Sequence, residues 1–213
     1  IYAKHAKGSK FTDVDGNQYI DWVNAVTAVI LGHSDDIVDN AVKNQIDKGS
    51  IYTLNSPLEI ELAELLNKEI PSSEMVRYTK GGGDACAVAI RIARGVTGKD
   101  KVIFSGYHGW HDWYQAANFG ADPVTGEFPF AGIEPIGIPQ ALAGTVFPFP
   151  EGNIDILTKH LEENKGEVAA IMMEPMRSML PPEGYLEKVQ QLAKVNGAIL
   201  IFDEVSCGWR MSI

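Results

Sequence analysis

The spacing of apolar residues changes along the chain and predicts two kinds of structure. Residues 10–22 carry apolar side chains on either side of Asp15-Gly16-Asn17, which predicts a β-hairpin. Residues 36–48 repeat apolar positions at helical intervals, and Ser56-Pro57 predicts the start of a second helix. From residue 75 onward, short apolar runs alternate with amphipathic segments. The two halves of this pattern indicate different architectures.

The second pattern is typical of an α/β fold. Nearly continuous apolar runs separated by amphipathic helices favour a mainly parallel sheet that is covered on both faces. The expected strands are 75–79, 101–106, 168–175 and 198–205, and the expected helices are 85–95, 153–164 and 184–196. Residues 107–150, rich in glycine, proline and aromatic residues, are expected to form a long excursion. We expect residues 1–40 to belong to a different structural unit from residues 41–213.

Composition narrows the classes of partner. The 213 residues are 45% hydrophobic and 22% charged, which is ordinary for a soluble globular protein. A formal net charge of −10 disfavours nucleic acid as a partner. No apolar run approaches the about 20 residues that span a bilayer, so no membrane partner is expected. Two cysteines outside any CxxC pair fit a reducing, cytoplasmic location.

A run of three glycines precedes the helix expected at 85–95. Bare backbone N–H groups at a helix N-terminus bind phosphate, so Gly81-Gly82-Gly83-Asp84 is a candidate phosphate loop. The alternative is a tight turn capped by Asp84. The loop lacks both the Walker A string and a complete GxGxxG fingerprint. The expected buried stripe of the helix consists of Ala85, Val88, Ala89, Ile92 and Ala93.

The apolar run 198–202 ends at Asp203. Ligands of open α/β sheets lie beyond the carboxyl ends of the strands, so Asp203 is a candidate functional residue. A buried carboxylate requires a partner, and a pyridinium nitrogen is a chemically suitable one. Two alternatives are a Walker B motif of a nucleotide hydrolase, which would lack its Walker A partner, and an aspartate that caps the next helix.

An aromatic run follows the strand expected at 101–106. Tyr107 lies where its ring could stack on a planar cofactor, whereas Trp110 and Trp113 are expected to pack the loop onto the core. His108 and His111, with Asp112, could instead bind a metal. Their spacing of three differs from the four of a helical HExxH pair, and no third ligand set is evident, so we predict no metal site.

Taken together, these segments resemble the class III aminotransferases along nearly the whole chain, most strongly the glutamate-1-semialdehyde aminomutase branch. The matching strings are DVDGNQYIDW (13–22), LGH (31–33), LEIELAELL (58–66), GGGDACAVAIRIAR (81–94), GYHGWHDW (106–113), EP (174–175) and GAILIFDEVSCGWR (197–210). The resemblance implies a pyridoxal 5′-phosphate (PLP) enzyme of fold type I that works as a homodimer. Residues 1–40 would then begin the small domain, and 41–213 would form an incomplete PLP-binding large domain.

The resemblance also implies roles around the cofactor, at Gly82, Gly83, Tyr107, His108, Glu174, Asp203 and Val205. The backbone of the two glycines would hold the phosphate, and the aromatic residue before His108-Gly109 would stack on the ring. Asp203 would pair with the ring nitrogen as the catalytic carboxylate, and Val205 would press on the opposite ring face.

Glu174 would support cofactor placement in the same arrangement. Two positions depart from the family pattern. Gly81 and Gly83 stand where the family has hydroxyl residues, so backbone N–H groups would hold the phosphate alone. Val26 stands where the aminomutases carry a bulky aromatic residue, which leaves the substrate open.

The resemblance further implies a Schiff-base lysine beyond Asp203, but every lysine of the chain precedes Asp203. We therefore expect a truncated chain that is inactive alone. The expected activity of the parent protein is that of an aminotransferase or 2,1-aminomutase. It would act on a small amino or oxo substrate through an external aldimine and a quinonoid. The alternative is a non-catalytic module that kept the fold for dimerisation or PLP binding.

Overall fold

The structure is a computed structural model that describes residues 1–120, 134–177 and 179–210. Contacts divide the chain into two compact units, Ile1–Val76 and Arg77–Ile213, and each is described by itself. This division does not coincide with the boundary expected after residue 40. The assignment of residues 1–40 and 41–213 to two domains of a longer protein stays a prediction.

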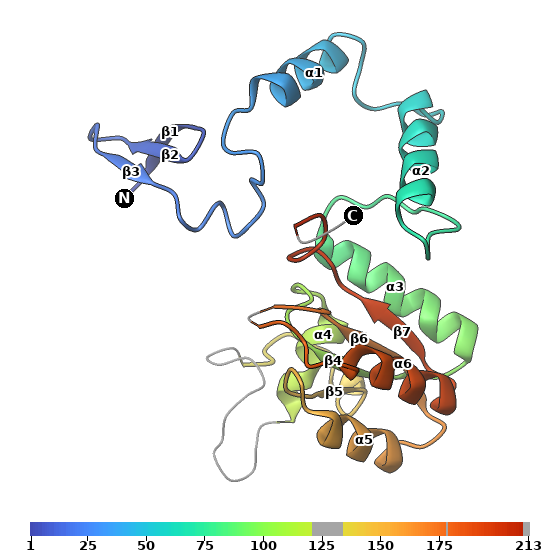
Figure 1. Ribbon diagram of the computed structural model, residues 1–213. Helices are drawn as coiled ribbons and strands as arrows, with labels where there is room; N and C mark the ends of the chain where they lie inside the picture. The colour runs from blue at the N-terminus through green and yellow to red at the C-terminus, as the bar shows by residue number, and fades with distance from the viewer. Residues whose placement is uncertain (121–133, 178, 211–213) are drawn as a thin grey trace. The chain divides into compact units, whose positions relative to one another are not determined.

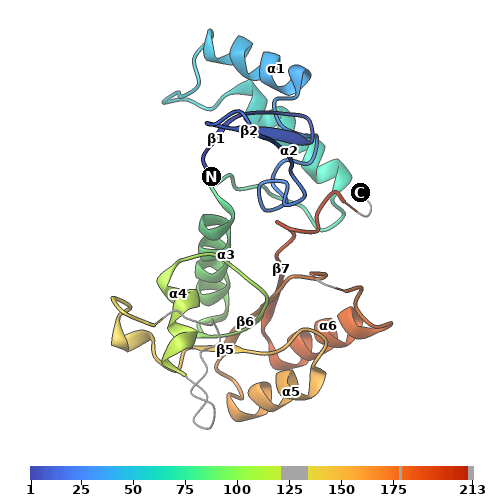
Figure 2. The same ribbon diagram turned by 90° about the vertical axis from the view of Figure 1, so that its left-hand side faces the viewer.

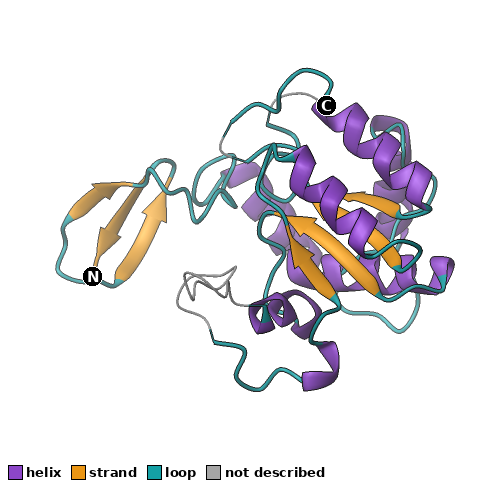
Figure 3. Ribbon diagram, turned by 90° about the horizontal axis from the view of Figure 1, so that it is seen from below, coloured by secondary structure: helices purple, strands orange, loops and turns teal. Residues whose placement is uncertain are grey.

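The first unit begins with a three-stranded antiparallel sheet of β1 (Ala3–Lys7), β2 (Lys10–Asp13) and β3 (Gln18–Ile20), which Figure 3 shows at the N-terminus. The buried carboxylate of Asp13 closes the turn between β2 and β3. It accepts hydrogen bonds from the backbone N–H groups of Asp15 and Asn17 and from the hydroxyl of Tyr19. The expected hairpin is confirmed.

Two helices follow in the first unit, α1 (Asp36–Ile46) and α2 (Pro57–Glu69) (Figure 1). The Asp35 side chain caps α1. Ser56 and Glu59 form a reciprocal capping box at the start of α2, with Pro57 at its first position. Both helices match the expected segments, and neither buries a residue.

The second unit contains a parallel sheet, which confirms the α/β expectation. Its strand order is β5-β4-β6-β7, with β4 at Lys101–Ser105, β5 at Val146–Pro148, β6 at Val168–Met173 and β7 at Ile199–Phe202. Strand β5 lies inside the segment 107–150 and was missed as a strand. The rest of that segment includes the 3₁₀ turns Ala116–Phe119 and Gln140–Leu142, and its residues 121–133 lie outside the described ranges.

Helices cover both faces of this sheet (Figures 1 and 2). One face carries α3 (Gly82–Thr97) and α4 (Asp112–Gln115), and the other carries α5 (Ile154–Glu163) and α6 (Tyr185–Asn196). Successive side chains of β4 point to opposite faces of the sheet, so each face has its own hydrophobic core. Val102 and Phe104 pack with α3, while Ile103 packs with α5 and α6. Burying such a side chain contributes about 1.5–3 kcal/mol.

One local expectation is wrong and another is wrong in part. Residues 75–79 do not form a strand, because no described strand forms hydrogen bonds with their backbone.

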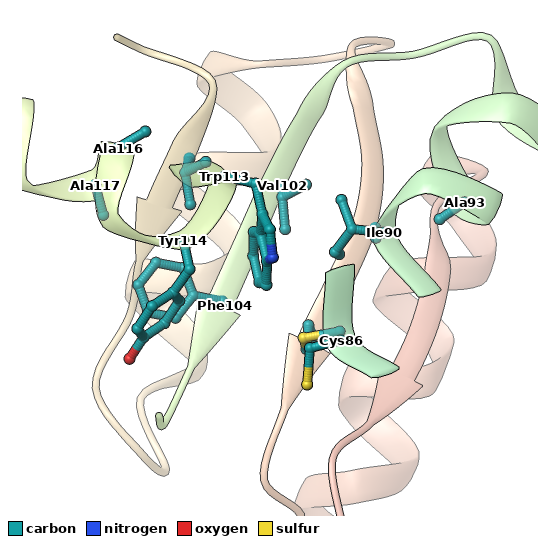
Figure 4. Packing of buried hydrophobic residues seen from close by; sticks show 12 residues of the cluster. Cys86, Ile90, Ala93, Val102, Phe104, Trp113, Tyr114, Ala116 and Ala117 are labelled. Carbon is teal, nitrogen blue, oxygen red and sulfur yellow. The ribbon is translucent and has the colours of Figure 1, made fainter. Parts of the chain in front are cut away.

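The expected buried stripe of α3 is partly confirmed. Ala93 is buried as expected, and Figure 4 shows it together with Cys86 and Ile90, which were not in the stripe. Ala85 and Ile92 are exposed, whereas Val88 and Ala89 are half-buried. The face that packs on the sheet is therefore the one that carries Cys86, Ile90 and Ala93.

Candidate functional site

The ends of three neighbouring strands bring the candidate residues together. The register pairs Ser105 with Met173 and Met173 with Phe202. The next residues along the three strands therefore lie side by side at the carboxyl edge of the sheet. Backbone hydrogen bonds continue the ladder there, from Glu174 N–H to the Ser105 carbonyl (3.1 Å) and from Asp203 N–H to the Met173 carbonyl (2.8 Å).

Asp203 is the centre of a buried polar cluster. Its side chain is buried, with only 7% of the residue exposed, and it lies on the α3 side because Ile201, two positions earlier, packs there. Oδ2 accepts hydrogen bonds from the Cys86 thiol (3.3 Å) and from His108 Nδ1 (2.8 Å). Oδ1 accepts one from the Val205 N–H (3.0 Å). Burial raises the pKa of Asp203, but the hydrogen bonds from His108 and Val205 outweigh it, so the net pKa is lowered.

Both ring nitrogens of His108 have partners that can only accept. Nε2 lies 3.1 Å from the Ser105 carbonyl oxygen, and Nδ1 lies 2.8 Å from the carboxylate of Asp203. Each nitrogen donates a hydrogen where its contact is a hydrogen bond, because a carbonyl and a carboxylate oxygen only accept. The two contacts together fix the orientation of the imidazole ring, and the ring in turn holds the carboxylate of Asp203 in place.

Cys86 is the member of the cluster that sequence reasoning missed. It lies on the first turns of α3 with 6% of its surface exposed. Burial, followed by the charge of Asp203, raises the pKa of its thiol to about 12, so the sulfur keeps its hydrogen. The helical phase that buries Ile90 also places Cys86 four positions earlier on the same face, and that phase was the signal available in the sequence.

The glycine loop lies close to the other elements of the site. In the described chain, α3 begins at Gly82 without a side-chain cap. A Cβ atom on Gly82 would lie 3.0 Å from a methyl group of Val205. Gly109, with a φ of +98°, approaches so closely that an added Cβ would lie 2.7 Å from the Cα of Gly83.

Glu174 fixes the backbone that carries Tyr107. Its buried carboxylate accepts the Tyr107 N–H through Oε1 (2.7 Å). Gly106 makes room for this carboxylate, because a Cβ there would lie 2.6 Å from Oε1. The ring of Tyr107 packs edge-on against Tyr114, with centroids 5.9 Å apart, and the residue stays 45% exposed. Tyr114 thus supports the ring of Tyr107, while much of Tyr107 faces solvent.

The two histidines of the aromatic run do not converge. His108 contacts Asp203, whereas His111 Nε2 lies 3.1 Å from Asp84 Oδ1. The alternative metal cluster of His108, His111 and Asp112 is therefore not formed in the described part of the chain. Trp113 is buried as expected, but Trp110 is exposed, so it does not pack the loop onto the core.

Within the described residues, no helix is long and apolar enough to cross a membrane.

Comparison with known proteins gives consistent similarities. The model of the aminotransferase class-III family matches residues 1–212. The chain is 40% identical over 218 residues to a glutamate-1-semialdehyde 2,1-aminomutase of Methanococcus maripaludis, covering 100% of this chain and 50% of that protein. It is 39% identical over 220 residues to a 3-aminobutyryl-CoA aminotransferase of Cloacimonas acidaminovorans, covering 100% of this chain and 49% of that protein.

A solved structure described as a transaminase with PLP bound superimposes with a TM-score of 0.84 at 25% identity, covering 96% of this chain and 48% of that chain. The chain spans about half the length of the curated relatives it matches. Within that half it has the fold of the PLP-dependent transaminases, as the sequence led us to expect. The match to the class III model argues against the alternative that residues 199–204 form a Walker B motif of a nucleotide hydrolase. The chain belongs to the class III aminotransferase family.

Proposed function

We propose that this chain forms the part of a PLP site that holds the phosphate and the ring, in an aminotransferase or 2,1-aminomutase that acts on a small amino or oxo substrate. The observation that carries the proposal is the ionised, buried carboxylate of Asp203 at the carboxyl end of β7. The fold of PLP-bound transaminases and the family membership support it.

The free acceptor capacity of Asp203 fits a ring nitrogen. A carboxylate has about four lone-pair positions. Cys86 and His108 use Oδ2, and Val205 uses one position on Oδ1. One position on Oδ1 remains for a further donor such as a protonated pyridine nitrogen. The negative charge of Asp203 favours the protonated form of that nitrogen, and His108 holds the carboxylate in place.

The start of α3 fits a phosphate. The N–H groups of Gly82, Gly83 and Asp84 precede the first intrahelical hydrogen bond, which runs from Ala85 to Gly81. Helix α3 has no side-chain cap, as is also true of α4 and α6, so no described side chain occupies these N–H groups. These N–H groups and the positive end of the helix dipole would bind the phosphate without a hydroxyl side chain.

Tyr107 and Val205 would enclose the ring. Glu174 holds the Tyr107 backbone, and Val205 lies against Gly82 at the start of the phosphate loop. We propose that the tyrosine ring stacks on one face and that the valine contacts the other, which would align the ring with Asp203. When bound, PLP supplies an electron sink that stabilises a carbanion next to the amino group.

We propose that the whole protein works as a homodimer in the cytoplasm. Helices α1 and α2 bury none of their residues and expose large apolar side chains such as Ile37, Ile60 and Leu65, which supports a covering partner. The two cysteines are free, which supports a reducing compartment.

Pyridoxamine 5′-phosphate tests the binding proposal without a Schiff base. Calorimetry should show that it binds the purified protein and that pyridoxamine, which lacks the phosphate, binds at least about tenfold more weakly. Asp203→Asn should also weaken binding of pyridoxamine 5′-phosphate at least about tenfold, which corresponds to a loss of about 1.4 kcal/mol in binding free energy. Asp155→Asn, on the exposed surface of α5, is the matched control and should bind normally. Equal binding of both ligands, or of both variants, would overturn the proposal.

We propose that residues 1–213 alone bind the cofactor without turnover, because every lysine among them precedes Asp203. Borohydride reduction of the PLP-treated chain, followed by peptide mapping, should leave every lysine unmodified except for slow surface reaction. A stoichiometric adduct at one lysine with turnover of an amino donor would contradict this proposal.

A further inference from the structure

Cys86, His108 and Asp203 place three different metal-ligating atoms around one point. The thiol sulfur, a ring nitrogen and a carboxylate oxygen all lie within 4.8 Å of one another, and all three residues are buried. The sulfur lies 3.3 Å from Asp203 Oδ2, and Nδ1 of His108 lies 2.8 Å from the same oxygen. We propose that these residues form a binding site for Zn²⁺, or a similar borderline divalent ion, when the cofactor is absent.

The two distances to Asp203 Oδ2, from the Cys86 sulfur and from His108 Nδ1, are close to those that a tetrahedral zinc ion requires. Bonds of about 2.0–2.3 Å to nitrogen, oxygen and sulfur put neighbouring ligand atoms about 3.3–3.6 Å apart. The sulfur–oxygen separation already matches, and the nitrogen–oxygen pair must open by about 0.5 Å, which a small rotation of the Asp203 carboxylate supplies. A mixture of sulfur, nitrogen and oxygen ligands favours zinc over the hard ions calcium and magnesium.

The surroundings already have the hydrogen bonds of a metal site. The second nitrogen of His108, Nε2, donates to the Ser105 carbonyl, which leaves Nδ1 to face the metal. The second oxygen of Asp203 accepts the Val205 N–H, which fixes the carboxylate. Groups of this kind orient the ligands of metal centres, and their loss typically weakens binding by about 10–100-fold.

Charge and protons balance in the bound state. Zinc would bind the Cys86 thiolate, the Asp203 carboxylate and neutral His108, so the charges of the ion and the three side chains sum to zero. Two protons leave for solvent, one from the thiol and one from Nδ1. Within the described ranges no further histidine, cysteine or carboxylate side chain joins these three ligands, so a water molecule would be the fourth ligand.

Metal and cofactor would compete for the same carboxylate. This part of the inference rests on the proposed function, because it requires Asp203 to face the ring nitrogen. The metal would bind Oδ2 and neutralise the carboxylate, so Oδ1 would attract a protonated ring nitrogen less strongly. We infer that the ion holds the cofactor-free protein in a form that cannot take up PLP until the metal is removed.

Cobalt provides a direct probe of the thiolate. Co²⁺ is titrated into cofactor-free protein, and absorption is followed for the thiolate-to-cobalt charge-transfer band in the near ultraviolet and for the visible bands of tetrahedral Co²⁺. The band should appear at one equivalent in the unaltered protein and disappear on addition of excess Zn²⁺. No band in the unaltered protein would overturn the proposal.

The second cysteine supplies the matched control. Cys86→Val keeps the volume and the apolar packing of the helix face but removes the sulfur, so the band should be lost while circular dichroism stays unchanged. Cys207→Ser should keep the band, because Cys207 lies outside the cluster. A band that survives Cys86→Val, or that requires Cys207, would refute the site.

Pre-incubation with pyridoxamine 5′-phosphate separates this inference from the proposed function. Cobalt affinity should fall at least about tenfold at saturating ligand, in line with a shared carboxylate. Unchanged cobalt affinity in ligand-saturated protein would overturn the competition. If the ligand does not bind at all, the proposed function fails, and the dependence of the band on Cys86 still decides the metal site.

Discussion

His108 and Asp203 lie 95 positions apart in the sequence, and Nδ1 of the histidine lies 2.8 Å from Oδ2 of the aspartate. The ends of β4 and β7, on either side of β6, bring them together. The contact orients the carboxylate, and it offsets part of the free-energy cost of burying a charge. We regard His108 as a positioning residue that acts through Asp203.

Replacement of His108 tests this role. His108→Gln removes a charge-assisted hydrogen bond worth about 1.5–3 kcal/mol, so the free energy of unfolding should fall by about that amount. The affinity for pyridoxamine 5′-phosphate should also fall, because the Asp203 carboxylate is no longer held. Urea unfolding and calorimetry measure the two effects. His5→Gln, on the exposed strand β1, is the control, and equal behaviour of the two variants would contradict the role.

Acid should weaken the contribution of Asp203 to stability. Its pKa is lowered in the folded protein, so the stabilisation is present above the unfolded value of about 3.9 and is lost as the pH falls through the folded value. The difference in free energy of unfolding between the unaltered protein and Asp203→Asn should therefore be largest near neutral pH and shrink below about pH 4. Urea unfolding across this range measures it. A difference that grows on acidification would contradict the lowered pKa.

Gly109 should tolerate no side chain. Gly109→Ala places a methyl group 2.7 Å from the Cα of Gly83, in addition to the strain of a φ of +98°. Gly137→Ala has a similar φ of +86° but open space around the new atom, so it isolates the backbone strain. We expect about 1–2 kcal/mol of destabilisation at Gly137 and about 1–3 kcal/mol more at Gly109. Thermal unfolding measures both.

The same pair of variants separates stability from binding. Gly109→Ala should also weaken binding of pyridoxamine 5′-phosphate, because the backbone of Gly83 must move, while Gly137→Ala should bind normally. Equal losses at the two positions would show that the close approach of Gly109 to Gly83 does not shape the phosphate loop.

Glu174 should act through its acceptor oxygen. Glu174→Gln keeps a carbonyl that can accept the Tyr107 N–H, whereas Glu174→Ala leaves that buried group without its partner, at a cost of about 1–3 kcal/mol. We expect the alanine variant to lose more stability and more affinity for pyridoxamine 5′-phosphate than the glutamine variant. The reverse order would show that the charge of Glu174, and not its hydrogen bond to Tyr107, is what the site requires.

Much of the fold could be predicted from the sequence, because strong local signals agree with the final packing. The helix start at Ser56-Pro57 and the turn at Asp15-Gly16-Asn17 are local and formed as expected. The apolar run ending at Asp203 predicted the edge of the sheet at which the candidate residues meet, since the carboxyl ends of parallel strands lie at one edge. Strand β5 was missed because three residues ending in Pro148 carry too weak a pattern.

The contacts of the site were less predictable. The cluster of Cys86, His108 and Asp203 depends on the rotation of α3 and on the register of three strands. A choice of helix face that differs by one position moves Cys86 out of contact. The tie between Glu174 and the Tyr107 backbone depends on Gly106, where a side chain would collide with the carboxylate. The helical face that Cys86 shares with Ile90 is a local signal, but the contacts themselves join segments that are distant in the sequence.

We propose above that Asp203 keeps a bound ring nitrogen protonated. Nitrogen NMR of pyridoxamine 5′-phosphate, labelled at the ring nitrogen and bound to the purified protein, reads that protonation state. We expect a pyridinium signal in the unaltered protein that persists to alkaline pH, and a neutral pyridine signal in Asp203→Asn under the same conditions. The same ring-nitrogen shift and the same pH dependence in both proteins would contradict this proposal.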